Sequence, residues 1–125
     1  MPCMYVVDSN GDNGHRLTAN ENAEGFPAWS PDSRQIIFST ETAGDGSSSQ
    51  LFIANADRNN IRQLTRQGKR NAFPRFTPDG NQLLFSSDRD GPLLDLYIMD
   101  VDGSHVRRLT SGGINSYPIW FAVKP

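Results

Sequence analysis

The sequence of 125 residues has only one cysteine, Cys3, which excludes an internal disulfide and a zinc site built from several cysteines. It also lacks any run of about 18 apolar residues, so no helix is expected to span or insert into a membrane. Neither sign of charge dominates, because 12 basic residues stand against 14 acidic ones. This balance gives no electrostatic reason to expect a nucleic-acid or anionic-membrane partner.

Motifs for common catalytic chemistry are missing as well. The chain has no Gly-x-Ser-x-Gly, no His-Glu-x-x-His and no glycine-rich phosphate loop. His15 and His105 have no second His or Cys close by in the sequence. Residues 8–12 begin like a calcium loop, but Asn13 and Ala19 stand where that loop requires Gly and Glu. We therefore expect a protein that is not an enzyme and that uses no metal or other cofactor.

What the chain does contain is turn residues and a repeat. Glycine and proline occur 11 and 8 times, which is typical of many short strands joined by tight turns. Pro27 recurs as Pro74 and Pro118, at steps of 47 and 44, and each follows an aromatic residue. Further landmarks keep the same order: Leu-Thr at 17–18, 64–65 and 109–110, the turns at 30–33 and 77–80, and the apolar runs at 4–8, 51–55 and 96–100.

Each repeat holds four short apolar runs separated by turn signals. In the second repeat the runs are 74–77, 82–87, 95–101 and 106–110. Their length and their β-branched and aromatic residues predict strands, and no stretch has a helical period with proper caps. The sequence therefore predicts an all-β protein built from four-stranded antiparallel units.

Several of these runs are continuously apolar, as in Leu83-Leu84-Phe85, which indicates a sheet covered on both faces. Without helices, the covering layers must be other sheets. Four-stranded sheets that repeat about every 45 residues and stack around an axis form a β-propeller. A two-layer β-sandwich is the structural alternative, although it does not require the repeat.

The repeat resembles that of the TolB β-propeller family. The resemblance rests on aromatic-Pro-x-[Trp/Phe]-[Ser/Thr]-Pro-Asp-[Gly/Ser], then [Ile/Leu]-x-Phe-Ser, Leu-Tyr-Ile-Met-Asp and Arg-x-Leu-Thr. Ser86-Ser87-Asp88-Arg89-Asp90-Gly91 is similar to that family's loop between the second and third strands. The pattern is specific for the fold, and it is shared by TolB, by the propellers of prolyl-oligopeptidase-type peptidases and by many exported proteins.

The whole chain, 1–125, is interpreted as one partial propeller of about 2.75 blades, fewer than a closed TolB-like ring needs. Its expected parts are a part-blade at 4–18, blades at 26–65 and 73–110, and a lone first strand at 117–123. An open arc would expose two apolar blade faces. We therefore expect either a fragment of a longer protein or a chain that completes its ring as a homodimer.

Two sets of polar residues are structural candidates. Asp32 and Asp79 follow proline in the repeated turn, where a carboxylate accepts backbone N–H groups. Asp88 and Arg89 form a predicted ion pair or loop clamp, in which Arg89 donates to carbonyl groups.

A third set is the candidate binding site. Asn71 and Asn115 lie three residues before the repeated proline, and Glu24 takes that place in the first repeat. The first strand of a blade is the innermost, so these residues are predicted to ring the mouth of the axial channel. Arg70 and Arg75 lie nearby and could bind a carboxylate with their planar guanidinium groups. A solvated channel rim without a ligand is the alternative interpretation.

The resemblance implies a non-catalytic protein-binding scaffold in the periplasm of a Gram-negative cell, with an envelope partner such as the peptidoglycan-associated lipoprotein. Residues 1–8 lack the basic start and apolar core of a signal peptide, so export would need a leader outside this sequence. One rival function is the gating propeller of a prolyl-oligopeptidase-type serine peptidase. Another is a self-assembling partial propeller without a specific ligand.

Overall fold

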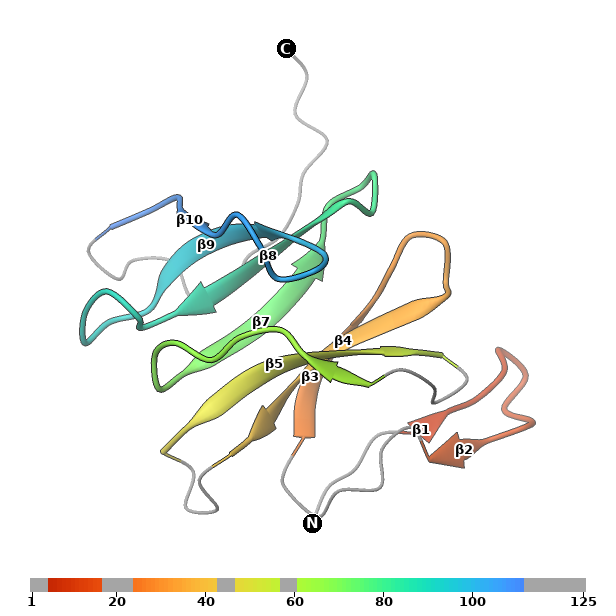
Figure 1. The fold of residues 1–125 in the computed structure, drawn as a ribbon. Helices are drawn as coiled ribbons and strands as arrows, with labels where there is room; N and C mark the ends of the chain where they lie inside the picture. Colours follow the sequence, from red (N-terminus) through yellow and green to blue (C-terminus); the bar gives the residue numbers. More distant parts are fainter. Residues whose placement is uncertain (1–4, 17–23, 43–46, 57–60, 112–125) are drawn as a thin grey trace.

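The fold is a stack of antiparallel sheets, seen in a computed structural model that describes residues 5–16, 24–42, 47–56 and 61–111 (Figure 1). Ten strands and no helix occur in these ranges. The strands are β1 Tyr5–Val6, β2 His15–Arg16, β3 Glu24–Trp29, β4 Gln35–Glu41, β5 Ser49–Asn55, β6 Arg62–Gln63, β7 Asn71–Phe76, β8 Gln82–Ser87, β9 Asp95–Asp100 and β10 Arg107–Arg108. The described residues accordingly offer no long apolar helix that could cross a membrane.

Two four-stranded sheets dominate the molecule. The first blade has the order β3-β4-β5-β6 and the second the order β7-β8-β9-β10, and every neighbouring pair is antiparallel. Each blade is therefore a simple meander in which consecutive strands are neighbours. The predicted all-β fold with four-stranded antiparallel sheets is confirmed.

The aromatic-proline motif makes a bulge in the first strand of each blade. The register with the second strand shifts between Gly25 and Ala28 in β3 and between Ala72 and Arg75 in β7. In the second blade the shift is accompanied by a positive φ of 54° at Phe73. A bulge tolerates proline because one residue there leaves the hydrogen-bonded ladder. The repeated Phe-Pro pair therefore bends the innermost strand of each blade.

The main core lies between the two blades. One face of the first blade contributes Ile37, Leu51 and Ile53, which are at most 1% exposed. The facing side of the second blade contributes Leu83, Phe85, Tyr97 and Met99 to the same cluster. Burial of each such side chain stabilises the fold by about 1.5–3 kcal/mol. Because both faces of the first blade are covered, its strands have nearly continuous apolar runs, as the sequence indicates.

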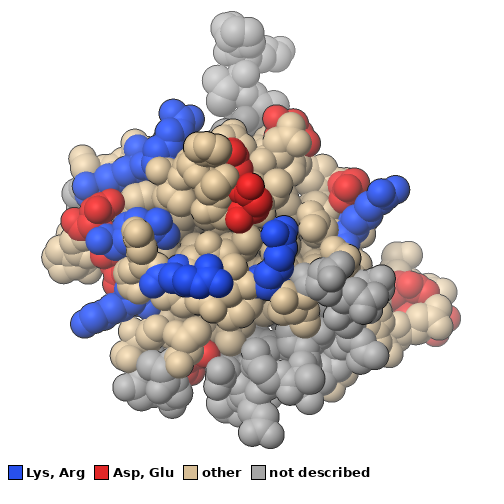
Figure 2. Space-filling model, in the orientation of Figure 1, with Lys and Arg blue, Asp and Glu red and all other residues tan. Residues whose placement is uncertain are grey.

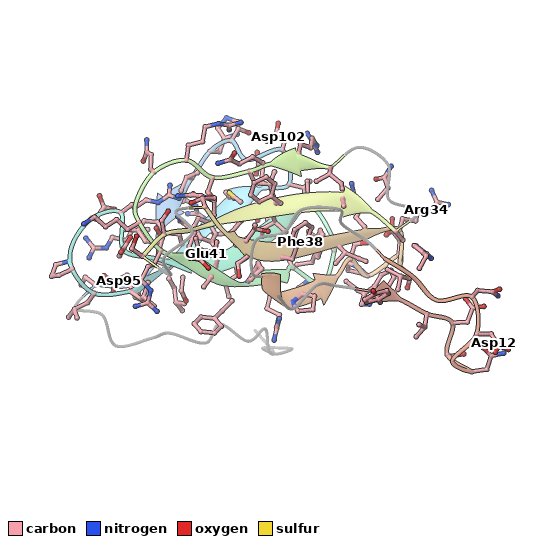
Figure 3. All side chains as sticks on the ribbon, turned by 90° about the horizontal axis from the view of Figure 1, so that it is seen from below. Asp12, Arg34, Phe38, Glu41, Asp95 and Asp102 are labelled. Carbon is pink, nitrogen blue, oxygen red and sulfur yellow. The ribbon has the colours of Figure 1, made fainter. Side chains whose placement is uncertain are left out.

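The hairpin of β1 and β2 packs on the other face of the first blade. Val6 contacts a second apolar cluster of Ile36, Phe38 and Ala54. The His15 ring nitrogen Nε2 lies 3.1 Å from the Ala56 carbonyl oxygen. Figure 3 shows Phe38 among the layered strands and the tip of the hairpin, labelled at Asp12, projecting away from them.

Some predicted boundaries lie outside the described residues. The lone strand at 117–123 is among them, as are both ends of the part-blade predicted at 4–18. The first blade spans 24–63 and the second 71–108, close to the predicted ranges of 26–65 and 73–110. The extent of the single domain and the number of blades in the parent protein stay predictions.

Candidate binding site

Asp32 and Asp79 hold the turns that join the first two strands of each blade. In the second blade Asp79 Oδ1 accepts the Thr77 hydroxyl at 2.6 Å and the Asn81 N–H at 3.0 Å. In the first blade Asp32 Oδ1 accepts the Ser30 hydroxyl at 2.6 Å and the Arg34 N–H at 3.0 Å. These bonds favour the ionised form, so they lower the pKa of both carboxyl groups, the hydroxyl bond most strongly.

Asp88 fastens the loop between the blades. Its Oδ1 accepts the backbone N–H groups of Lys69 and Arg70 at 2.8 and 3.0 Å. Its own N–H donates to the Arg70 carbonyl, and Arg70 also forms a parallel bridge with Ser49 of β5. A Cβ at Gly68 would lie 2.9 Å from Asp88 Oδ1, so glycine is required for this close approach. Asp88 therefore positions the chain segment that passes from the first blade to the second.

Asn71 joins the blades through its side-chain amide. The residue is fully buried, with 0% of its surface exposed. Its Nδ2 lies 2.9 Å from the Gln67 carbonyl oxygen, 3.1 Å from Gln50 Oε1 and 3.3 Å from the Ser49 carbonyl oxygen. Its Oδ1 accepts a hydrogen bond from Arg89. The amide is thus used inside the protein, which leaves no polar group of Asn71 directed to solvent at a channel mouth.

Arg89 extends this network to the aromatic core. Its Nη2 donates to Asn71 Oδ1 at 3.2 Å and its Nε to the Ser87 hydroxyl at 3.1 Å. Its guanidinium carbon lies 5.2 Å from the ring centre of Phe85 and 5.1 Å from that of Tyr97. The predicted ion pair with Asp88 is not among the interactions of the described residues, which place the two side chains on different partners. Arg89 instead stacks on two aromatic rings, a favourable arrangement for a guanidinium.

The predicted channel-mouth residues are only partly brought together. Arg70 and Asn71 adjoin the Asp88 clamp, whereas the exposed Arg75 lies further along β7 and its Nη1 donates to the Pro74 carbonyl. Glu24 begins β3, but its side chain is outside the described set, and Asn115 is outside the described residues. A ligand role for these five residues stays a prediction.

Sequence reasoning missed several hydrogen bonds that form within each blade. The Thr65 hydroxyl donates to Gln50 at 2.6 Å, and the Tyr97 hydroxyl donates to Asp90. The periodic Leu-Thr motif contained the signal for Thr65, whose hydroxyl also accepts the Leu51 N–H at 2.9 Å. Within the described ranges, no three His, Cys, Asp or Glu side chains gather into a group that could hold a metal ion.

A cavity lies at the end of the first blade where the Asp32 turn is found. It has a volume of about 520 Å³ and is bordered by the turn at 32–35 and by Asn55 and Ala56. Figure 3 shows Arg34, from this turn, at the opposite end of the molecule from Asp95. The Asp32 carboxylate is used within its own turn, so the exposed Arg34 and the neutral polar side chains of Ser33, Gln35 and Asn55 are the other polar groups of this lining.

The family model described as the TolB beta propeller domain matches residues 1–123. The chain belongs to this family. The family accounts for the two blades, for their shared turn and for the repeated position of the Leu-Thr pair. A search of curated proteins finds no match.

Two solved TolB structures are similar to this TolB-family chain. TolB from Acinetobacter baumannii is 26% identical with a TM-score of 0.76, and the match covers 92% of this chain and 28% of that one. A protein described as TolB from Agrobacterium tumefaciens is also 26% identical, with a TM-score of 0.77 and coverages of 88% and 38%. The chain thus spans about a third of the length of these structures.

A third solved structure, the tricorn protease, shares the fold with this TolB-family chain. It is 21% identical with a TM-score of 0.69, and the match covers 86% of this chain and 11% of the protease. At this identity the similarity indicates the propeller fold alone.

Proposed function

We propose that the chain is a non-catalytic, protein-binding segment of a TolB-type propeller. Membership of the TolB propeller family across residues 1–123 carries this proposal. The polar groups of the turns support it, because Asp32 and Asp79 are held by hydrogen bonds within the turns. The exposed Arg70 and Arg75 remain available on the inner strand and its approach, where the planar guanidinium can bind a carboxylate.

The proposed partner is an envelope protein, and the proposed compartment is the periplasm. The similarity to TolB structures from two bacteria supports the compartment, and neither structure identifies a partner for this chain. The partner that the family resemblance implies is the peptidoglycan-associated lipoprotein. We place its contact at the first-strand ends, at Arg70 and Arg75.

Binding of the purified, soluble peptidoglycan-associated lipoprotein to the immobilised full chain tests this function. We expect saturable binding that weakens severalfold in the double variant Arg70→Gln/Arg75→Gln, because two exposed cations contribute roughly 0.2–1 kcal/mol each. Arg62→Gln is the matched control, since Arg62 is exposed on the outermost strand β6. No binding above background, or equal loss in both variants, would contradict the proposal.

A gating propeller of a serine peptidase is the second candidate. Puromycin hydrolase supports it only at the level of the fold, since that structure is 21% identical to this chain with a TM-score of 0.61. The gene sequence that follows Pro125 decides between the two. A Gly-x-Ser-x-Gly in an α/β-hydrolase pattern would favour the peptidase, whereas further blades would favour the scaffold.

A self-assembling chain is the third candidate, and the homodimer that would complete a ring belongs to it. Native mass spectrometry of the full chain measures this directly. A discrete dimer at micromolar concentration would support ring completion, and a soluble monomer would contradict it.

A further inference from the structure

A basic groove runs between the outer parts of the two blades. Two adjoining cavities of about 330 and 190 Å³ share Gln67, Arg89 and Val106 as lining residues. We name them together the inter-blade groove. Arg66 lines it from the first-blade side, and Arg107 and Arg108 line it from the second.

The positive charge of this groove is largely uncompensated. Arg66 and Arg107 are exposed, and the described residues provide neither with an ion pair. Arg108 is paired, with its Nη2 2.6 Å from Asp95 Oδ2. The one acidic lining residue, Asp90, accepts the hydroxyl of Tyr97. Figure 2 shows several basic side chains on this face, with acidic ones among them, over the region where β10 and the β6–β7 loop lie in Figure 1.

Arg89 lines both cavities of the groove and forms no ion pair within the described part of the chain. It is half-buried, and its side-chain hydrogen bonds to the described residues go to neutral acceptors, the Asn71 amide and the Ser87 hydroxyl. Burial lowers the pKa of Arg89, and the nearby Tyr97 and Asp90 act against that shift. Nη1 has no hydrogen-bond partner among the described residues. A guanidinium stays charged at any ordinary pH, so a partly desolvated one favours an anion from outside.

The propeller scaffold itself does not require Arg89. The second strand of the first blade has Thr40 at the position of Ser87 in the repeat, and Thr42 stands two residues later where the second blade has Arg89. The buried Thr40 hydroxyl has no hydrogen-bond partner among the residues that the structure describes. The first blade nevertheless forms the same four-stranded sheet. An arginine at this place is therefore not needed for a four-stranded blade to form.

We propose that the inter-blade groove binds a carboxylate of an extended acidic peptide segment, with Arg89 as its anchor. Arg66 and Arg107 flank the bound segment from the two blades, and Val106 offers an apolar contact beside it. The proposal rests on the protein-binding function above, and it assigns that function a second contact away from the first-strand ends. The carboxylate comes either from an Asp or Glu side chain or from a chain end.

Fluorescence anisotropy with defined peptides tests the groove on the full chain. The first probe is a fluorescein-labelled, C-terminally amidated peptide of Gly, Ser and Glu. The second has Gln in place of each Glu, and the third combines Gln with a free C-terminal carboxylate. We expect the Glu peptide to bind at least about tenfold more tightly than the amidated Gln peptide, because an ionised acceptor strengthens the bond to Arg89. Binding of the third probe, if it matches the first, assigns the site to chain ends.

Variants locate the binding within the protein. Arg66→Gln/Arg107→Gln changes only exposed side chains and is expected to weaken binding of the Glu peptide about three- to fivefold. Arg89→Lys keeps the charge but loses the planar donor group, and a loss of about tenfold is expected. Arg34→Gln is the control, because Arg34 is exposed on the Asp32 turn outside the groove lining, and its change should leave affinity within about twofold.

Several outcomes would overturn the inference. One is equal affinity for the Glu and both Gln peptides, and another is an equal effect of the groove variants and Arg34→Gln. A third is no binding up to about 1 mM peptide, which is weaker than about −4 kcal/mol. In a further outcome, lipoprotein binding depends on Arg70 and Arg75 but not on Arg66 and Arg107. That result would support the proposed function and contradict the groove as a second contact. If the lipoprotein does not bind but the Glu peptide does, the groove stands and the proposed function is contradicted.

Discussion

The first and second blades use the same hydrogen bonds with different residues. In the first blade the Leu51 N–H donates to the Thr65 hydroxyl at 2.9 Å, and in the second the Leu96 N–H donates to the Thr110 hydroxyl at the same distance. Each threonine then donates to the residue before that leucine, a Gln in one blade and Asp95 in the other. The acceptor is neutral in one blade and acidic in the other, so the scaffold specifies the geometry and leaves the charge free to differ.

Corresponding residues of the two blades differ in their exposed fraction where the adjoining layers differ. Phe76 ends the first strand of the second blade and is 8% exposed, because it joins the core against the first blade. Trp29 has the same place in the first blade and is 48% exposed. Residue type alone therefore does not set burial, since the larger aromatic is the more exposed. The comparison separates what each repeat encodes from what the adjoining layer adds, and mutations can test both parts.

The largest expected effect is at the core between the blades. Leu83→Ala removes a fully buried side chain and should lower the free energy of unfolding by about 3 kcal/mol through lost burial and a residual cavity. Leu93→Ala, at a site that is 55% exposed, should cost less than about 0.5 kcal/mol. Urea unfolding followed by circular dichroism measures both. Similar costs would mean that the blades do not pack as described.

The second effect concerns the polar contact between the blades. Asn71→Ala removes the buried amide that bonds to Arg89 and Gln50, so we expect a loss of about 2–3 kcal/mol in the free energy of unfolding. Asn55→Ala, on the half-buried end of β5, is the control and should cost less than about 1 kcal/mol. Equal losses in urea unfolding would contradict the role assigned to the Asn71 amide.

The third effect is a loss of stability at alkaline pH, caused by a tyrosine of the second blade that has no counterpart in the first. Burial, followed by the hydrogen bond to Asp90, raises the pKa of Tyr97 to about 12, whereas the first blade has Phe52 at this place. The folded state therefore holds the Tyr97 proton more tightly than the unfolded chain, whose tyrosine pKa is about 10. Stability should fall as pH rises from about 10 to about 12, and less steeply in Tyr97→Phe. Identical slopes in urea titrations across this range would refute the assignment.

The smallest effect is in the turns. Ser33 in the first blade has a φ of 62°, and its counterpart in the second blade is Gly80 with a φ of 76°. Glycine adopts this conformation without the steric cost, so Ser33→Gly should raise stability by about 0.5 kcal/mol. Gly80→Ser should lower it by a similar amount, since a Cβ there would meet only ordinary contacts with Pro31. Thermal unfolding of both variants checks the opposite signs.

The blades could be predicted because their signals are local and repeated. The Thr77-Pro78-Asp79-Gly80 turn contains its own hydroxyl, carboxylate and glycine, and the structure shows the expected hydrogen bonds to Asp79. Continuous apolar runs such as Leu83-Leu84-Phe85 indicated covering layers on both faces of a sheet, and one of these layers is the first blade. Local turn chemistry and periodicity need no knowledge of which residues meet across the blades.

The candidate site was harder to predict because its contacts join distant positions. Asn71 was expected at a solvated rim. It is instead buried where the chain passes from the first blade to the second, and it contacts Gln50, which precedes it by 21 residues. Asp88 and Arg89 were predicted to form an ion pair or a loop clamp, but they lie in a turn closed by the bond from the Gly91 N–H to the Asp88 carbonyl, and the Asp88 carboxylate accepts from Lys69 and Arg70 instead. The Arg89 guanidinium lies over the rings of Phe85 and Tyr97, which only the packed sheet brings together.

A double-mutant cycle between Gln50 and Asn71 tests the central claim most directly, because these side chains join the two blades at 3.1 Å. The free energy of unfolding is measured for Gln50→Ala, Asn71→Ala and the double variant. Packed blades predict that the double variant loses less than the sum of the single losses, with a coupling of about 1 kcal/mol. Losses that add to within about 0.3 kcal/mol would show that the two repeats do not share this contact, and would contradict the stacked-blade account.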